Sequence, residues 1–309
     1  VVELATLPNV RLMSRTTVTG AYDQGTYGAL ERLPQGAYDT HEGLPIECFW
    51  RIVAKQTILA AGALERSIAF ADNDRPGIMT AGAVRTYVNR WGVAPGQKIV
   101  VFGNNDDAHR TAQDLVAAGI EVAALVDSRP EAVANGDFPI YAGSMICGSR
   151  GRHGLKSVQL QRLDGTTDTI EADCLAVSGG WNPTVHMTCH MNGRPKWQPE
   201  IASFIPVPKT IPGLFAAGAC NGVFSTHRCL QEGHLAANAA LSALKIKIKK
   251  TPIPKAEDQG YSISALWAVP GEARAWVDLQ NDVTVKDIKQ AAVESYSSVE
   301  HMKRYTTQG

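Results

Sequence analysis

Residues 98–127 read KIVVFGNNDDAHRTAQDLVAAGIEVAALVD. The stretch opens with an apolar run that ends at Gly103, continues with a helical pattern to Ala118, and closes with a second apolar run and Asp127. A strand, a turn, a helix and a second strand that ends in an acidic residue form the Rossmann layout. The stretch therefore predicts an α/β domain of the kind that binds dinucleotides.

The turn of this motif departs from the usual fingerprint of small residues. Gly103 stands at the first expected position and Ala108 at the last. Asn105 occupies the place where a glycine lets the backbone approach a pyrophosphate, and Asp106 and Asp107 put negative charge beside it. We interpret the motif as a Rossmann scaffold that has lost, or never had, tight NAD(P) binding, and we expect this turn to hold no nucleotide.

A second strand–turn–helix pattern lies in residues 208–236, which read PKTIPGLFAAGACNGVFSTHRCLQEGHLA. An apolar run over 214–217 leads into a turn of small residues over 218–222. Ser225 or Thr226 can cap the helix that follows. A glycine-rich turn lets a ligand approach the backbone, and a helix N-terminus attracts phosphate. The pattern fits a nucleotide site, but it also fits a tight turn that binds nothing.

Composition and charge limit the classes of function. The 309 residues carry 30 basic and 30 acidic side chains, so we expect roughly two domains and no attraction to nucleic acid or an anionic membrane. No run is apolar enough to span a bilayer and no signal peptide is present, which favours a cytoplasmic protein. The scattered cysteines predict reduced thiols, with neither a disulfide framework nor a zinc site. They are Cys48, Cys147, Cys174, Cys189, Cys220 and Cys229.

The remaining pattern predicts elements and domains. Strands are expected over residues 9–22, 28–33, 46–60 and 173–177, a hairpin over 155–170, helices over 80–91, 284–291 and 298–304, and a basic glycine-rich loop over 143–154. His186 and His190 could share a helix face, but without a third ligand nearby we favour a structural or solvated role over a metal site. We predict a first dinucleotide-binding domain from residues 1–82 and 181–247, a second, degenerate one from 83–180, and a linker with a small helical module from 248–309.

Several motifs together resemble the alpha subunit of heterotetrameric sarcosine oxidase. The most specific are AGALER at 61–66 with NDRPG at 73–77, and VDLQNDVTVKDI at 277–288 with VEHMKRYTT at 299–307. The resemblance covers essentially the whole chain. Members of that family are much longer, with an N-terminal part that carries the first GxGxxG turn and a C-terminal folate-binding domain. The resemblance therefore implies that this chain, which starts at Val1, is the central portion of such a subunit.

The resemblance implies a fold and an activity. The fold is α/β, with FAD/NAD(P)-binding domains of the pyridine nucleotide-disulfide oxidoreductase type in a three-layer ββα arrangement: two Rossmann-like domains and a small helical C-terminal module. The activity is oxidative demethylation of sarcosine to glycine by a complex that uses oxygen and gives hydrogen peroxide with formaldehyde or methylene-tetrahydrofolate.

The same resemblance implies partners and cofactors. The partners are beta, gamma and delta subunits. FAD is expected in the beta subunit, FMN at the interface between alpha and beta, and a non-covalent NAD in the alpha subunit. Carried onto this sequence, the NAD contacts are Val18, Ala219, Phe224 and Thr226. We also expect the chain alone to bind NAD weakly or not at all, because the other wall of the site would lie upstream of Val1.

Two positions differ from related enzymes. FAD enzymes of this type carry an aspartate where this chain has Ala219, so a ligand other than FAD is implied. Opine and hydroxyproline dehydrogenases carry a Cys-x-Cys for an iron–sulfur cluster where residues 277–280 read VDLQ, so we expect no metal in the tail. No constellation typical of a catalytic site stands out. A subunit of such a dehydrogenase and a stand-alone NAD(P)H-dependent flavoprotein reductase remain alternatives.

Overall fold

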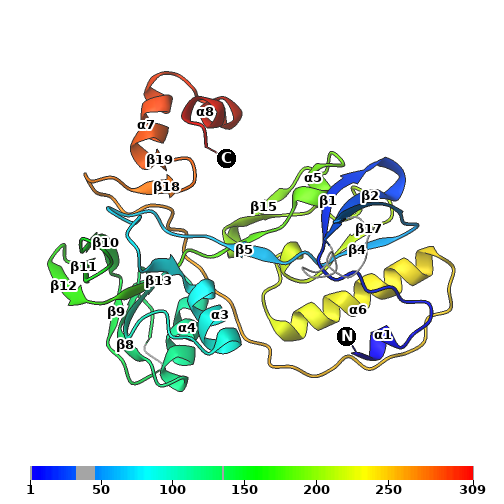
Figure 1. The fold of residues 1–309 in the computed structure, drawn as a ribbon, viewed down its shortest axis with the longest axis horizontal. Helices are drawn as coiled ribbons and strands as arrows, with labels where there is room; N and C mark the ends of the chain where they lie inside the picture. The colour runs from blue at the N-terminus through cyan, green and yellow to red at the C-terminus, as the bar shows by residue number, and fades with distance from the viewer. Residues whose placement is uncertain (1, 33–45, 134–135, 309) are drawn as a thin grey trace. The chain divides into compact units, whose positions relative to one another are not determined.

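The computed structural model describes residues 2–32, 46–133 and 136–308, and the chain forms two compact units (Figure 1). Unit 1 comprises Val1–Ala63, Pro183–Gln198 and Phe204–Gln259, and unit 2 comprises Leu64–Asn182, Pro199–Ser203 and Gly260–Gly309. The units divide the chain differently from the predicted segments, since residues 64–82 and the C-terminal module pack in unit 2. The assignment of the four segments to domains stays a prediction.

Unit 2 is built in three layers. Its central sheet has the order β6-β13-β7-β8-β9, and the neighbouring strands are parallel. These strands are β6 (Ile78–Thr80), β13 (Cys174–Ser178), β7 (Lys98–Gly103), β8 (Glu121–Asp127) and β9 (Ile140–Ala142). The helices α3 (Ala81–Trp91) and α4 (Asp106–Ala117) cover one face, and an antiparallel sheet of β10 (Met145–Arg150), β11 (Ser157–Gln161) and β12 (Thr167–Glu171) covers the other. The predicted ββα arrangement is therefore confirmed.

Strand β7 contributes to both cores of this unit. Ile99 and Val101 pack in the cluster under the helices, and Val100 and Phe102 pack in the cluster shared with the antiparallel sheet. Successive side chains of a strand point to opposite faces, so a continuous apolar strand fills two cores at once. All four side chains are fully buried, and burial of each is worth roughly 1.5–3 kcal/mol.

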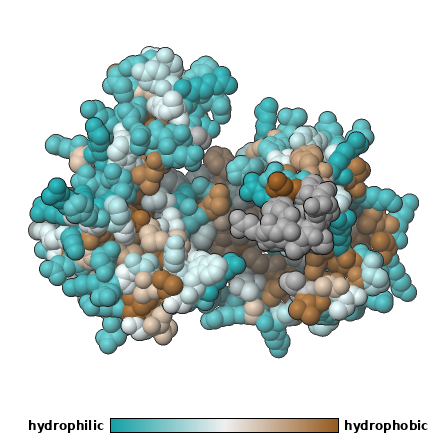
Figure 2. Space-filling view, viewed as in Figure 1, coloured by the Kyte–Doolittle hydropathy of each residue, from teal (hydrophilic) through white to brown (hydrophobic). Residues whose placement is uncertain are grey.

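The C-terminal part of unit 2 forms a small module with β18 (Trp276–Asp278), β19 (Val283–Thr284), α7 (Val285–Val293) and α8 (Val299–Thr306). Thr284 caps α7 reciprocally: its hydroxyl accepts from the N–H of Asp287 at 3.3 Å, and the Asp287 carboxylate accepts from the N–H of Thr284 at 2.8 Å. The Asn73 side chain exchanges hydrogen bonds of 2.9 and 2.7 Å with the backbone of Trp276. The visible surface over α7 and α8 is mainly hydrophilic (Figure 2). Both predicted helices of the module are confirmed.

Unit 1 contains an antiparallel sheet and a parallel strand pair. The sheet has β1 (Thr16–Tyr22), β2 (Thr26–Arg32) and β3 (Glu47–Val53), and the pair has β4 (Thr57–Leu59) and β17 (Leu214–Ala216). Its helices include α1 (Val2–Ala5), α5 (His186–Cys189) and α6 (Thr226–Ala243), with 3-10 turns η1 (Asp23–Gly25) and η3 (Gly218–Asn221). Elsewhere β5 (Ala63–Glu65) pairs with β14 (Trp181–Pro183), and β15 (Lys196–Gln198) pairs with β16 (Ser203–Ile205), with η2 (Pro199–Ile201) between them.

Several element predictions are confirmed and three are wrong. The single strand predicted over 46–60 is divided into β3 and β4, which lie in different sheets. The helix predicted over 80–91 is α3, and the predicted hairpin is formed by β11 and β12. The loop predicted over 143–154 instead contains β10, which pairs with β11 and buries Ile146 completely. The strand predicted from residue 9 begins only at Thr16. His190 has a structural role, because its Nδ1 accepts a hydrogen bond from the N–H of Ala21 at 3.4 Å.

Glu65 is the last residue of β5, and its carboxylate reaches the beginning of α3 in unit 2. One carboxylate oxygen accepts a hydrogen bond from the N–H of Gly82 at 2.5 Å. Burial raises the pKa of Glu65 from its ordinary 4.5 to about 7; the Gly82 bond opposes this rise and the charge of Asp107 adds to it. Because the folded pKa exceeds the unfolded one, this group stabilises the fold fully below about pH 4.5. That contribution is lost as the pH rises through about 7.

We predict that Glu65→Gln removes this pH dependence. The unfolding free energy of the native chain should fall by on the order of 2 kcal/mol between about pH 5 and about pH 8. The amide keeps an acceptor for Gly82 and has no proton to lose, so the variant should show a flatter profile in urea denaturation. Glu171→Gln is the matched control, because the Glu171 side chain is 83% exposed. A native-like pH dependence in Glu65→Gln would contradict the prediction.

Candidate functional site

Strand β17 leads into the turn that the sequence predicts as a nucleotide site. Its last residue, Ala216, lies opposite Leu59 of β4, and the N–H of Ala217 then donates to the carbonyl of Leu59 at 2.9 Å. Gly218 and Gly222 follow with φ values of 75° and 82°, a left-handed conformation that glycine adopts without strain. These two glycines let the chain turn tightly between the strand and helix α6.

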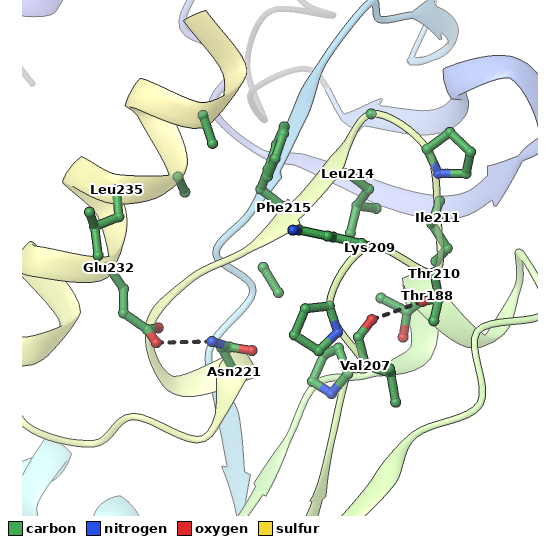
Figure 3. A pocket seen from close by; sticks show the side chains of 17 residues that line it. Thr188, Val207, Lys209, Thr210, Ile211, Leu214, Phe215, Asn221, Glu232 and Leu235 are labelled. Carbon is green, nitrogen blue, oxygen red and sulfur yellow. Dashed lines mark hydrogen bonds between the residues drawn. The ribbon is translucent and has the colours of Figure 1, made fainter. Parts of the chain in front are cut away.

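Glu232 of helix α6 fixes the conformation of this turn. One carboxylate oxygen accepts from the N–H of Gly218 at 2.8 Å, and the other accepts from the side-chain amide of Asn221 at 2.9 Å (Figure 3). Hydrogen bonds to a charged group contribute roughly 1.5–3 kcal/mol each. The shape of the turn therefore depends on a side chain of the helix that follows it.

The N-terminus of α6 already holds a negatively charged side chain. Ser225 is the N-cap, and its hydroxyl accepts from the N–H of Arg228 at 3.3 Å. The same hydroxyl donates to the carboxylate of Asp258, which also lies 3.3 Å from Nε of Arg228. The hydrogen bond from Ser225, with a smaller contribution from Arg228, holds the pKa of Asp258 below its ordinary value. A helix N-terminus stabilises negative charge, so this end of α6 suits an anionic group.

Three of the four predicted NAD contacts lie in this motif. Ala219 is half-buried in η3, Phe224 is half-buried just before the helix, and Thr226 is the exposed first residue of α6. Val18 lies in strand β1, in the antiparallel sheet of the same unit, with 44% of its surface exposed. The fold thus groups the first three along one turn and places Val18 on a separate sheet. Contact of the four residues with NAD stays a prediction.

A cavity of about 480 Å³ adjoins the turn and shares Asn221 and Glu232 with it (Figure 3). The other lining residues are Thr188, the segment 206–216, and Leu235, Ala236 and Ala239 of α6. Most of these side chains are apolar. The cavity was not predicted from the sequence, although the prolines at 206, 208 and 212 mark a stretch that cannot form a helix.

The turn after Gly103 in unit 2 differs from the turn before α6, because hydrogen bonds of its own side chains set its shape. The side-chain oxygen of Asn105 caps α4 by accepting from the N–H of Asp107 at 2.9 Å, and its amide donates to the carbonyl of Ser178 at 3.0 Å. The two acidic residues that we expected to oppose a phosphate are both paired with arginines: Asp106 with Arg129 and Asp107 with Arg110, each at 2.7 Å. Asn105 is completely buried, so its amide does not leave a gap for a ligand.

The described part of the chain offers neither a metal centre nor a membrane span. Within residues 2–32, 46–133 and 136–308, no group of three or more His, Cys, Asp or Glu side chains is placed to hold a metal ion. Over the same ranges, no helix has the length and apolarity needed to cross a membrane.

The fold is that of the FAD/NAD(P)-binding oxidoreductases. L-proline dehydrogenase from P. horikoshii superposes with a TM-score of 0.63 at 17% identity, over 94% of this chain and 54% of that protein. Thioredoxin reductase from T. acidophilum superposes with a TM-score of 0.50 at 13% identity, over 75% of this chain and 72% of that one. Identities this low establish the fold class alone, and the predicted fold class is confirmed.

Sequence comparison relates the chain to sarcosine oxidases. The family described as "Sarcosine oxidase A3 domain" matches residues 272–309. The alpha chain of sarcosine oxidase from Rhizobium meliloti (strain 1021) is 42% identical over 99% of this chain, and that from Corynebacterium sp. (strain P-1) is 36% identical over 99%. A component of opine oxidase from Rhizobium meliloti is 24% identical over 62% of this chain. The chain is a relative of the sarcosine oxidase alpha subunits, as predicted, and it spans 31% and 34% of the length of these two relatives.

We predict that Glu232→Ala loosens the η3 turn. The variant leaves the N–H of Gly218 and the amide of Asn221 without their acceptor, so the unfolding free energy should fall by about 2–4 kcal/mol. Urea denaturation measures this change. Gln231→Ala is the matched control, because Gln231 is the neighbouring residue of α6 and its side chain bonds to His227 of the same helix, at 2.8 Å on the exposed surface. Equal losses in the two variants would show that Glu232 does not hold the turn.

Proposed function

We propose that this chain is the NAD-binding scaffold portion of a sarcosine oxidase alpha subunit. The observation that carries the proposal is the 42% identity to an alpha subunit of this enzyme along 99% of this chain. The complex would act in the cytoplasm and oxidise sarcosine to glycine with oxygen, giving hydrogen peroxide and formaldehyde or methylene-tetrahydrofolate. Its other members would be the beta, gamma and delta subunits, with FAD in beta and FMN where alpha meets beta.

The β17–η3–α6 motif is the part of this chain that we assign to NAD. The glycines at 218 and 222 keep the turn narrow, and Ser225 with the helix dipole offers a favourable place for negative charge. The carboxylate of Asp258 now accepts a hydrogen bond from Ser225 at that position, and a phosphate of the dinucleotide would take its place. Ala219, Phe224 and Thr226 would line the bound dinucleotide, and Val18 would approach its adenine end.

This chain would bind NAD and support the complex, and it would not itself catalyse the oxidation. The flavins, when bound to the complex, would accept the electrons from the amine. Ala219 brings no carboxylate to the turn, so it offers no acceptor for the ribityl hydroxyls of a flavin, and the site favours a ligand that needs none there. NAD in such a site would stabilise the fold through its binding energy.

The assembled complex provides the test of this function. The full-length subunit that contains this chain is co-expressed with its partner subunits, and oxygen consumption is measured with sarcosine and with opines. We expect oxidation of sarcosine, and we expect acid denaturation to release NAD in amounts equal to those of the alpha subunit. Oxidation of opines without sarcosine would assign the chain to an opine oxidase type of complex. Release of no NAD would refute the cofactor assignment.

We further predict that Ala219→Asp lowers the NAD content of the complex. A carboxylate in η3 would face the phosphates of the ligand, and a loss of at least about 1.4 kcal/mol would weaken binding about tenfold. Ala219→Ser is the matched control, because it adds a polar atom of similar size without a charge. The NAD content is measured by chromatography of the denatured complex. Equal NAD content in the two variants would place the pyrophosphate elsewhere.

A further inference from the structure

The backbone of residues 260–264 runs across the Gly103 turn of unit 2. The N–H of Asp106 donates to the carbonyl of Ser262 at 3.2 Å, and the N–H of Ser264 donates to the carbonyl of Asn104 at 2.9 Å. Asn105 and Ile263 form an antiparallel bridge between these bonds. The segment thus pairs with the turn as a short extra strand, although it lies more than 150 residues further along the chain.

Side chains of the turn complete this pairing. The carboxylate of Asp106 accepts from the N–H of Ser262 at 2.8 Å, and Nη1 of Arg129 donates to the carbonyl of Ser262 at 3.1 Å. Arg110 donates to the carbonyl of Gly260. An acidic side chain repels a phosphate but accepts a hydrogen bond from a peptide N–H. The acidic residues that make this turn unsuited to a dinucleotide therefore make it suited to a peptide backbone.

The carboxylate that would bind a ribose in a Rossmann domain is already bonded to side chains of this chain. Asp127, at the end of β8, is completely buried. Its carboxylate accepts from Nη2 of Arg129 at 2.8 Å and lies 2.7 Å from Nε2 of His109. In a Rossmann domain the corresponding carboxylate binds a ribose hydroxyl, whereas here it anchors the arginine that holds the 260–264 segment.

The side chains of the segment fill the edge of the sheet. A methyl group built on Gly180, just beyond the end of β13, would collide with the side chain of Ile263 and would lie 3.3 Å from the hydroxyl of Tyr261. Ligands of open parallel sheets bind at the carboxyl ends of the strands. Ile263 and Tyr261 therefore lie where a dinucleotide would otherwise enter unit 2.

We propose that the Gly103 turn is a binding site for an extended peptide, and that residues 260–264 of this chain occupy it in place of a dinucleotide. The turn keeps the strand and helix of a Rossmann motif, but its donors and acceptors are matched to a backbone. The occupied turn fastens the start of the C-terminal part of the chain, 260–309, to the central sheet of unit 2. Nucleotide binding is consequently left to other parts of the protein.

Amide hydrogen exchange on the whole chain tests the proposal, with Asp106→Ala as the variant. The amides of Ser262 and Ser264 should exchange at least tenfold faster than in the native chain. Asp114→Ala is the matched control: Asp114 lies in the same helix, pairs with Arg85 at the same 2.7 Å, and has a similar side-chain exposure of 33% against 36% for Asp106. Unchanged exchange of β7 amides verifies that each variant is folded. Equal exchange of residues 262 and 264 in the two variants would overturn the proposal.

Two further measurements test the proposal even if the Asp106→Ala variant fails to fold. One uses a second variant, and the other adds nucleotide to the native chain. Ser262→Pro removes the N–H that donates a hydrogen bond to the Asp106 carboxylate, so it should release residues 260–264 from the turn as Asp106→Ala does. Glu257→Pro lies outside this segment and should not release it. In the native chain, millimolar NAD⁺ or NADP⁺ should leave the exchange of residues 103–108 and 260–264 unchanged. Slower exchange of residues 103–108 with either nucleotide would overturn the proposal.

Discussion

The double burial of strand β7 is the constraint on which unit 2 depends. Ile99 and Val101 fill the core under α3 and α4, and Val100 and Phe102 fill the core under the antiparallel sheet. A polar residue at any of these positions would enter an apolar interior without a partner, which costs several kcal/mol. This requirement is independent of any ligand, so the Rossmann layout does not depend on nucleotide binding at the turn on its edge.

Carboxylates bind at three helix starts or turns of this chain, at two of them to a backbone N–H and at the third to the N-cap hydroxyl. Glu65 accepts from the N–H of Gly82 at the start of α3, Glu232 accepts from the N–H of Gly218, and Asp258 accepts from Ser225 at the start of α6. Turns and helix starts expose backbone N–H groups that need acceptors. A protein of this fold class can satisfy them with a ligand or with its own acidic side chains, and the choice decides whether a turn is open.

Local periodicity explains why the sequence predicts part of the fold and of the site. Neighbouring residues set the patterns of β7, α4 and β8, which are confirmed, whereas β10 resembles a loop until it pairs with β11. The candidates Val18, Ala219, Phe224 and Thr226 all come from the family resemblance, and the last three also lie in one motif that the sequence shows. The pairing of residues 260–264 with the Gly103 turn leaves no pattern, because it uses carbonyl and N–H groups that nearly every residue carries. The sequence therefore identifies the turn as degenerate without indicating what replaces its ligand.

The two strand–turn–helix motifs differ in how easily a ligand could enter. At α6, the N-cap Ser225 is buried, but the Asp258 carboxylate that it bonds pairs with Arg228 on the surface, and exposed charge pairs contribute little to stability. At α4, the N-cap Asn105 is buried and bonded to Asn104 and Ser178. Opening that turn would leave several buried polar groups unsatisfied, at about 1–3 kcal/mol for each group. Both N-caps are buried, and the two motifs differ in the partners of the N-caps: an exposed carboxylate at α6 and a buried amide network at α4. This difference, more than the number of glycines, supports our proposals of an anion at the α6 motif and a peptide contact at the α4 motif.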